Sequence, residues 1–226
     1  RTINYHIVAI RAFLKFLLKN DIDCLSPDKL ELAKVPSREV NYINDEDINK
    51  ILDAPKTFNK NILQQARDEA VLNFLYGTGL RVSELIFLQK KDIKLDSKQF
   101  SVVGKGSKLR SVFATKLARE KLKTYLDMRT DNSEYLFISL SGNQFGAHLS
   151  RNSIEDIVRK YARIAGIEKK VTPHTLRHSF ATSLIKKGAD IRAVQTLLGH
   201  ASITTTQIYT HIDDKHLQKV HDLLDI

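Results

Sequence analysis

Helical periodicity extends over most of this chain and leaves room for only a small sheet. Apolar residues recur at helical spacing in segments near 2–20, 61–76, 116–130, 150–165, 174–187, 190–198 and 202–211. Residues 98–103 and 109–114 instead predict two strands, joined by a Gly- and Lys-rich turn at 104–108, and a further short strand is expected at 135–139. The pattern predicts a mainly α fold with a small antiparallel β-sheet, in the α+β class.

The composition is that of an ordinary globular protein with an excess of positive charge. The 226 residues include 36 Lys and Arg against 26 Asp and Glu, which gives a formal net charge of +10. This charge fits a basic protein of any kind and a nucleic-acid-binding protein about equally well. No apolar run is long enough to span a bilayer and no secretory signal is visible, so we expect a cytoplasmic protein without a membrane partner. Cys24 is the single cysteine, which excludes an intrachain disulfide and a cysteine zinc site.

The chain divides into four expected parts. Residues 1–20 form a helix with an apolar stripe that is broad for a solvated helix, and residues 21–43 have no sustained periodicity and read as a linker. The main body covers residues 44–212, and residues 213–226 form a last helix with apolar residues on one face. The chain begins at Arg1 and its only methionine is Met128, so we expect a polypeptide truncated at its N-terminal side.

The main body opens with an acidic cluster that has two explanations. Asn44 precedes Asp45, Glu46 and Asp47, which suits an N-cap followed by an acidic first turn. A metal site is the weaker explanation, because no further acidic or histidine partners follow at ligand spacing.

The segment from Thr172 to His211 carries residues suited to phosphoryl transfer. These residues include His174, Arg177, His200 and Tyr209. Arginine pairs bidentately with phosphate, histidine moves protons near neutral pH, and a tyrosine hydroxyl can attack phosphorus to give a covalent ester. Taken singly, each residue has an ordinary structural explanation, such as a surface helix capped by Thr172 and Pro173. Taken together they suggest metal-free phosphoryl transfer through a protein–phosphate ester.

Two upstream sites could supply further groups. Arg81 is expected one turn into a helix that follows a glycine-bearing approach, where it either binds an anion or pairs with Glu84. Lys105 lies between glycines at the hairpin tip, with Lys108 and Arg110 close behind. This turn is either a solvated basic loop or a finger that enters a DNA groove and places Lys105 to protonate a leaving oxygen.

Three segments together resemble one protein family. They are GTGLRVSEL at 77–85, VGKG at 103–106, and nearly all of 172–211. In these segments the chain resembles the tyrosine recombinases, also called phage-integrase-type site-specific recombinases, and it is most similar to the Xer-type recombinases that resolve chromosome dimers. The resemblance covers essentially the whole chain. It implies that 1–20 is the last helix of a truncated N-terminal DNA-clamping domain, 44–212 a tyrosine recombinase catalytic domain, and 213–226 a helix exchanged between protomers.

The resemblance also implies a mechanism that needs no metal or cofactor. Tyr209 would attack a DNA phosphodiester to give a 3′-phosphotyrosine and a free 5′-hydroxyl. Arg81 and Arg177 would bind the non-bridging oxygens, while His174 assists proton transfer and Lys105 protonates the leaving oxygen. The implied catalytic set is Arg81, Lys105, His174, Arg177, His200 and Tyr209, and the implied DNA-binding residues are Lys105, Lys108 and Arg110.

The expected partners are a double-stranded recombination site and further protomers, in a homo- or hetero-tetramer joined by residues 213–226. The expected role is chromosome dimer resolution, linked to chromosome partition and cell division. Three alternatives remain open: an integrase or transposase of a mobile element, a nicking–closing enzyme like a type IB topoisomerase, and a catalytically silent DNA-binding regulator. The regulator is disfavoured because a pure binder has no need of all six catalytic residues.

Overall fold

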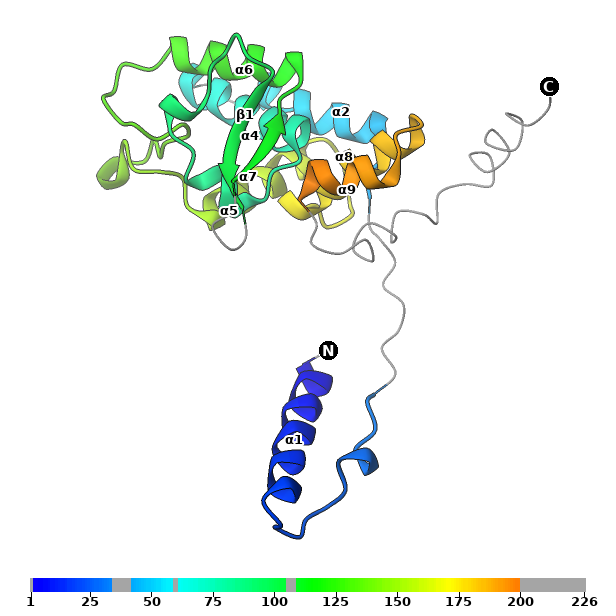
Figure 1. Ribbon diagram of the computed structural model, residues 1–226. Coiled ribbons are helices and arrows are strands. Elements are labelled where there is room, and N and C mark those ends of the chain that lie inside the picture. The colour runs from blue at the N-terminus through cyan, green and yellow to red at the C-terminus, as the bar shows by residue number, and fades with distance from the viewer. Residues whose placement is uncertain (1, 34–41, 59–60, 105–108, 200–226) are drawn as a thin grey trace, which may run out of the picture. The chain divides into compact units, whose positions relative to one another are not determined.

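A computed structural model of the chain describes residues 2–33, 42–58, 61–104 and 109–199. The chain forms two compact units, residues 1–39 and 40–226 (Figure 1). The expected helix at 202–211 and the last segment, 213–226, lie outside the described residues. In the part of the chain that is described, no helix is long and apolar enough to cross a membrane.

The first unit consists of one long helix and the extended segment that follows it, residues 20–33, called the strap below. Helix α1 covers Thr2–Lys19, and a 3₁₀ turn, η1, covers Pro27–Lys29. The Asn4 side chain donates to the carbonyl of Ala33 and accepts from its N–H, both at 2.9 Å, so the strap returns along α1. Large apolar side chains of α1, Phe13 and Phe16 among them, are about 60% exposed within this unit. The boundary between helix and linker that the sequence suggested remains a prediction.

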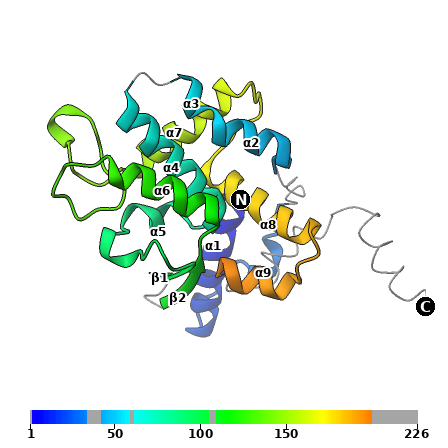
Figure 2. The same ribbon diagram turned by 90° about the horizontal axis from the view of Figure 1, so that it is seen from above.

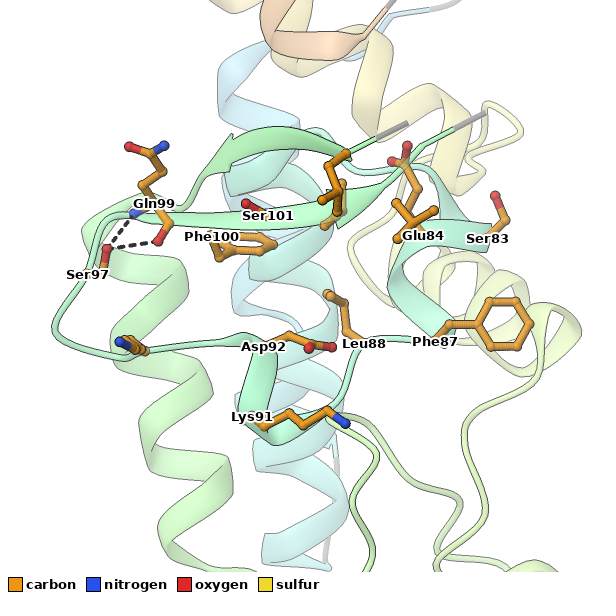
Figure 3. Close-up of a pocket in the computed structure, with 14 residues that line it drawn as sticks. Ser83, Glu84, Phe87, Leu88, Lys91, Asp92, Ser97, Gln99, Phe100 and Ser101 are labelled. Carbon is orange, nitrogen blue, oxygen red and sulfur yellow. Dashed lines mark hydrogen bonds between the residues drawn. The ribbon is translucent and has the colours of Figure 1, made fainter. Parts of the chain in front are cut away.

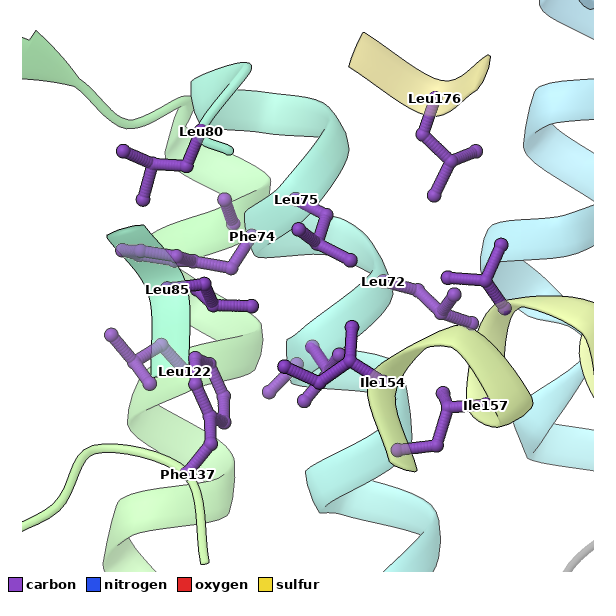
Figure 4. Packing of buried hydrophobic residues seen from close by; sticks show 14 of the residues in the cluster. Leu72, Phe74, Leu75, Leu80, Leu85, Leu122, Phe137, Ile154, Ile157 and Leu176 are labelled. Carbon is purple, nitrogen blue, oxygen red and sulfur yellow. The ribbon is translucent and has the colours of Figure 1, made fainter. Parts of the chain in front are cut away.

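The second unit is built around helix α4, Ile62–Thr78, which is buried around most of its surface. It packs against α2 (Asp45–Asp53), α6 (Lys116–Asp127), α7 (Arg151–Ile164) and α8 (Pro173–Lys186). Leucine and phenylalanine side chains of α4 fill the centre of the core, where they meet Leu122 of α6 and Ile154 of α7 (Figure 4). The core therefore fixes the C-terminal end of α4, and that end leads directly into the site described below.

Shorter elements complete this unit. They are α3 (Pro55–Phe58), α5 (Val82–Ile86), η2 (Lys90–Asp92), η3 (Gly142–Gln144) and α9 (Ile191–Leu198). Helices α8 and α9 contact each other and lie side by side in both views (Figures 1 and 2). A small second hydrophobic core, which contains Ala181, Val194 and Leu198, packs at this contact.

The sheet is the expected hairpin. Strand β1, Gln99–Val103, pairs antiparallel with β2, Leu109–Phe113, in a register that places Val102 opposite Arg110. The turn residues 105–108 lie outside the described residues. The short strand expected at 135–139 is wrong: Tyr135 and Ile138 make only isolated bridges, to Gln89 and His148. Among the described residues no strand runs beside the whole of this segment, so its apolar residues enter the core from an irregular loop.

Most helices of the second unit begin at a capping side chain. Asn44 accepts from the N–H of Asp47, as the sequence predicted, and Thr172 forms a reciprocal pair with Thr175 at the start of α8. The acidic residues after Asn44 thus occupy a first helical turn, where the positive end of the helix dipole favours them. Among the described residues no group of three or more His, Cys, Asp or Glu side chains could hold a metal ion.

Candidate active site

Two of the clefts that the described residues of the second unit form differ in chemistry. The larger has a volume of about 760 Å³ and lies between the hairpin and the α5–η2 segment (Figure 3). Phe100 and Leu88 face it, Ser97 and Gln99 bond to each other at its rim, and Glu84 lies at its edge. None of its described lining residues is one that the sequence predicted for catalysis.

The smaller cleft, of about 550 Å³, brings three of those residues together. Arg81 comes from the start of α5, and His174 and Arg177 come from the first turns of α8. Its other charged lining residues are Arg151, Glu155, Arg159 and Lys170. A concave surface with this excess of cations favours a polyanionic ligand over a neutral one. We therefore take the smaller cleft as the candidate active site.

Arg81 stands at the N-cap of α5 rather than one turn inside the helix. Gly79 adopts a left-handed conformation (φ 61°) that ends α4, and α5 begins only at Val82. The Arg81 guanidinium donates to Glu84 Oε1 and to the carbonyl of Gly199, both at 2.9 Å. Both sequence-based readings of Arg81 are thus compatible: it pairs with Glu84 and it also lines the cleft.

Arg177 is buried, with only 3% of its surface exposed. Its guanidinium donates to the carbonyl of Gly79, at the end of α4, and to that of Leu198, at the end of α9. Backbone carbonyls at helix C-termini carry partial negative charge and lack partners within the helix. Two helix ends therefore stabilise this buried cation and fix its position.

Arg110 points away from the hairpin tip and into the protein. Its side chain is 14% exposed, and it donates to Glu84 Oε2 and to the carbonyl of Leu197, both at 2.8 Å. This placement differs from the DNA-facing one expected from the sequence. The inward direction follows from the register, since the β2 residue opposite the buried Val102 faces the body of the protein.

Glu84 lies between Arg81 and Arg110 and is almost fully buried. Burial by itself would raise the pKa of this carboxyl group, but hydrogen bonds from Arg110 and from the Arg81 backbone outweigh it, so the pKa is lowered. Glu84 thus remains a carboxylate at neutral pH and carries the negative charge between two cations.

His174 lies on the exposed side of α8 and contacts a second histidine. Its Nε2 lies 2.6 Å from Nε2 of His178, so one ring donates to the other. The catalytic set that the sequence predicted does not include His178. The spacing of four residues on a helix was the signal that could have indicated this contact.

Several predicted site residues cannot be placed. Lys105, Lys108, His200 and Tyr209 lie outside the described residues. Conversely, the structure adds cleft residues that the sequence analysis did not nominate: Arg151, Glu155, Arg159 and Lys170. Arg151, Glu155 and Arg159 recur every four residues on α7, a spacing that places them on one helical face.

The sequence profile of the phage integrase family matches residues 41–216. The chain belongs to this family. Tyrosine recombinase XerD of Chlorobaculum tepidum is 42% identical over 223 residues, which cover 96% of this chain and 72% of that protein. The present chain also resembles the crystal structure of XerA recombinase, with a TM-score of 0.70 and 36% identity. The match covers 95% of this chain and 74% of that one.

A more distant structure shares the fold. The Tn1549 transposon integrase in complex with transposon right end DNA has a TM-score of 0.76 at 21% identity, and the match covers all of this chain and 79% of that one. The family and the fold class expected from the sequence are confirmed. This chain is a site-specific tyrosine recombinase with a mainly helical catalytic domain and a small two-stranded sheet.

Proposed function

We propose that the small cleft holds the scissile phosphate of a DNA strand and that Tyr209 attacks it to form a 3′-phosphotyrosine. The observation that carries the proposal is the convergence of Arg81 and Arg177, from segments far apart in sequence, on one cleft with His174 in its wall. The two guanidiniums would bind the non-bridging oxygens and stabilise the charge that builds up in the transition state.

The remaining steps use the other predicted residues. The Tyr209 hydroxyl loses its proton with help from His174, its oxygen bonds to phosphorus, and the 5′-oxygen leaves with a proton from Lys105. His200 hydrogen-bonds the phosphate. The 5′-hydroxyl of a partner strand then attacks the phosphotyrosine and releases Tyr209, so the phosphoester bond energy is retained and no ATP is required.

DNA would continue across the basic rim of the cleft. Arg151 and Arg159 lie on α7 and Lys170 in the loop before α8, where they can meet phosphates that flank the cleaved one. Glu155 pairs with Arg151 at 2.9 Å and orients it. The assembly would be a tetramer on two duplexes, joined by residues 213–226, and it would act in the cytoplasm, where chromosomal DNA lies.

We favour an Xer-like role in chromosome dimer resolution over integration of a mobile element. The supporting observation is sequence similarity: identity with XerD is 42%, and the likeness to the transposon integrase at 21% identity extends to the fold alone. An integrase remains the second candidate because it would use the same chemistry.

The test uses the full-length protein and a nicked suicide duplex that carries its recombination site. A nick just 3′ of the cleavage point lets the short fragment that carries the free 5′-hydroxyl diffuse away, so the covalent protein–DNA adduct accumulates. We expect an adduct with the wild type and none with Tyr209→Phe. The matched control is Tyr135→Phe, which should form the adduct normally. An adduct that persists in Tyr209→Phe contradicts the assignment of the nucleophile.

A further inference from the structure

Three arginines bind three successive carbonyls at the end of α9. Arg110 donates to Leu197 at 2.8 Å, Arg177 donates to Leu198, and Arg81 donates to Gly199 at 2.9 Å. These arginines come from β2, α8 and the start of α5. The last turn of α9 is therefore held by side chains of three separate elements, immediately before His200 in the sequence.

Arg110 also packs tightly against the backbone of Gly199. A Cβ atom at this position would lie 2.8 Å from Arg110 Cδ and 3.1 Å from its Nε, so no larger residue fits without displacing the arginine. Gly199 is also left-handed, with φ 63°. The glycine thus serves both the helix end and the close approach of Arg110.

Glu84 connects Arg110 to Arg81. Oε1 of Glu84 accepts from the Arg81 guanidinium at 2.9 Å, and Oε2 accepts from Arg110 at 2.8 Å and from the Arg81 backbone N–H at 2.8 Å. The side chain of Glu84 is only 4% exposed. If Arg110 were removed, this buried carboxylate would have Arg81 as its remaining cation and would attract it more strongly. The position of the Arg81 guanidinium therefore depends on Arg110.

The donor groups of Arg110 face inward. Its Nε and Nη2 point to Glu84 and its Nη1 points to Leu197, so each of its nitrogens has a protein acceptor. The side chain is only 14% exposed, and these bonds direct it toward Glu84 and the end of α9. A role within the protein therefore fits its geometry better than a contact with DNA.

We propose that Arg110 is a positioning residue for DNA cleavage. It acts through Glu84 and the end of α9 to hold the guanidinium of Arg81 where the phosphate is bound. This inference rests on the proposed function, because it takes Arg81 as a phosphate ligand. It replaces the DNA-binding role that the hairpin sequence suggested for Arg110.

The first test compares Arg110→Met with a matched control, Arg119→Met. Arg119 is also a partly buried arginine, and it donates to the backbone carbonyl of Leu95, but it does not line the cleft. On the suicide duplex we expect Arg110→Met to slow adduct formation by about 10²-fold, the scale of a misplaced reacting group. DNA affinity should stay within about threefold of the wild type, and Arg119→Met should cleave at the wild-type rate. A wild-type rate in Arg110→Met overturns the proposal.

The second test separates positioning from a general loss of structure and needs no catalysis. In the Tyr209→Phe background, DNA with a normal scissile phosphate is compared with DNA carrying an uncharged methylphosphonate there. The affinity for the duplex with the normal phosphate, divided by the affinity for the methylphosphonate duplex, reports how strongly Arg81 and Arg177 bind the phosphate charge. We expect the ratio to fall in Arg110→Met and to remain unchanged in Arg119→Met; an unchanged ratio in Arg110→Met overturns the proposal.

Arg110→Lys covers the case in which Arg110→Met does not fold. Lysine keeps the charge but cannot bond Glu84 and Leu197 together in the arginine geometry, so it should shift rate and ratio in the same direction by a smaller factor. Wild-type values in this variant would then overturn the proposal. A wild type that forms no adduct would instead refute the proposed function itself, which makes the two failures distinguishable.

Discussion

At the scale of single residues, Gly79 shows how closely the backbone and the site depend on each other. It ends α4 in a left-handed conformation, and its carbonyl accepts a hydrogen bond from Arg177. A Cβ atom there would lie 2.7 Å from the ring of Phe180 and 3.0 Å from Leu198. The position requires glycine both for its φ and for the space around it.

We expect Gly79→Ala to lower the free energy of unfolding by about 2–4 kcal/mol, since the left-handed strain and the overpacking add. The control is Gly166→Ala, where φ is 76° but nothing lies within 4 Å of the added carbon. That change should cost only the strain, about 1 kcal/mol. Urea denaturation of both variants measures the difference, and equal costs would show that the contact with Phe180 is relieved freely.

The sequence predicted three site residues that share one cleft, but it did not predict all of their contacts. Arg81, His174 and Arg177 do line one cleft, and the pairing of Arg81 with Glu84 follows from local spacing. The inward turn of Arg110 depends on how the hairpin packs against the end of α9. Such a contact joins segments far apart in the chain, and neither periodicity nor capping rules carry information about it.

At the scale of elements, local signals predicted the helices well and the buried charges poorly. Caps such as Asn44 act within one turn, so the sequence shows them directly. Within α4, however, Arg67 and Asp68 are both buried, and Asp68 accepts from the Tyr161 hydroxyl of α7 at 2.9 Å. Charged residues usually mark a solvated face, and only the packing of α7 on α4 shows that these do not.

The loop after α6 is organised by Arg129 instead of by strand pairing. Its guanidinium is 1% exposed, donates to the carbonyls of Ser133, Tyr135 and Leu136, and pairs with Asp131. These bonds satisfy backbone carbonyls that a neighbouring strand would otherwise satisfy, which explains why the predicted strand at 135–139 is absent. The apolar residues of the loop still reach the core.

The Asp131 carboxylate gives this loop a pH-dependent stability. The hydrogen bond from Arg129 lowers the pKa of Asp131 from 3.8 to about 2, so its contribution is complete above pH 4 and is lost as the pH falls toward 2. We expect Asp131→Asn to cost about 2 kcal/mol at neutral pH, with the difference from wild type shrinking below pH 4. Chemical denaturation at several pH values measures this.

The control for this experiment is Asp127→Asn. Asp127 forms an exposed pair with Lys123, with 59% and 62% of the two side chains exposed, so its loss should change stability little at any pH. A cost of Asp131→Asn that stays constant from neutral pH to pH 3 would contradict the assigned pKa.

At the scale of the whole molecule, part of the excess positive charge is concentrated around one cleft. The small cleft and its rim gather Arg81, Arg151, Arg159, Lys170 and Arg177, and Glu155 is the one acidic residue among the described residues that line it. Composition alone could not separate a generally basic protein from a DNA-binding one. The clustering of these side chains around the predicted catalytic residues favours DNA binding.

If Lys170 contacts a phosphate at this rim, its removal should change the salt dependence of DNA binding. Each neutralised phosphate releases condensed counterions, so we expect Lys170→Ala to reduce the slope of log affinity against log salt concentration by about 0.9. Lys123→Ala removes the same charge from α6, outside the cleft, where it pairs with Asp127 at 2.6 Å. Both variants lower the net charge by one. A slope that changes equally in the two would mean that total charge, and not the position of Lys170, determines the effect; a change in Lys170→Ala alone places a DNA phosphate at the rim of the cleft.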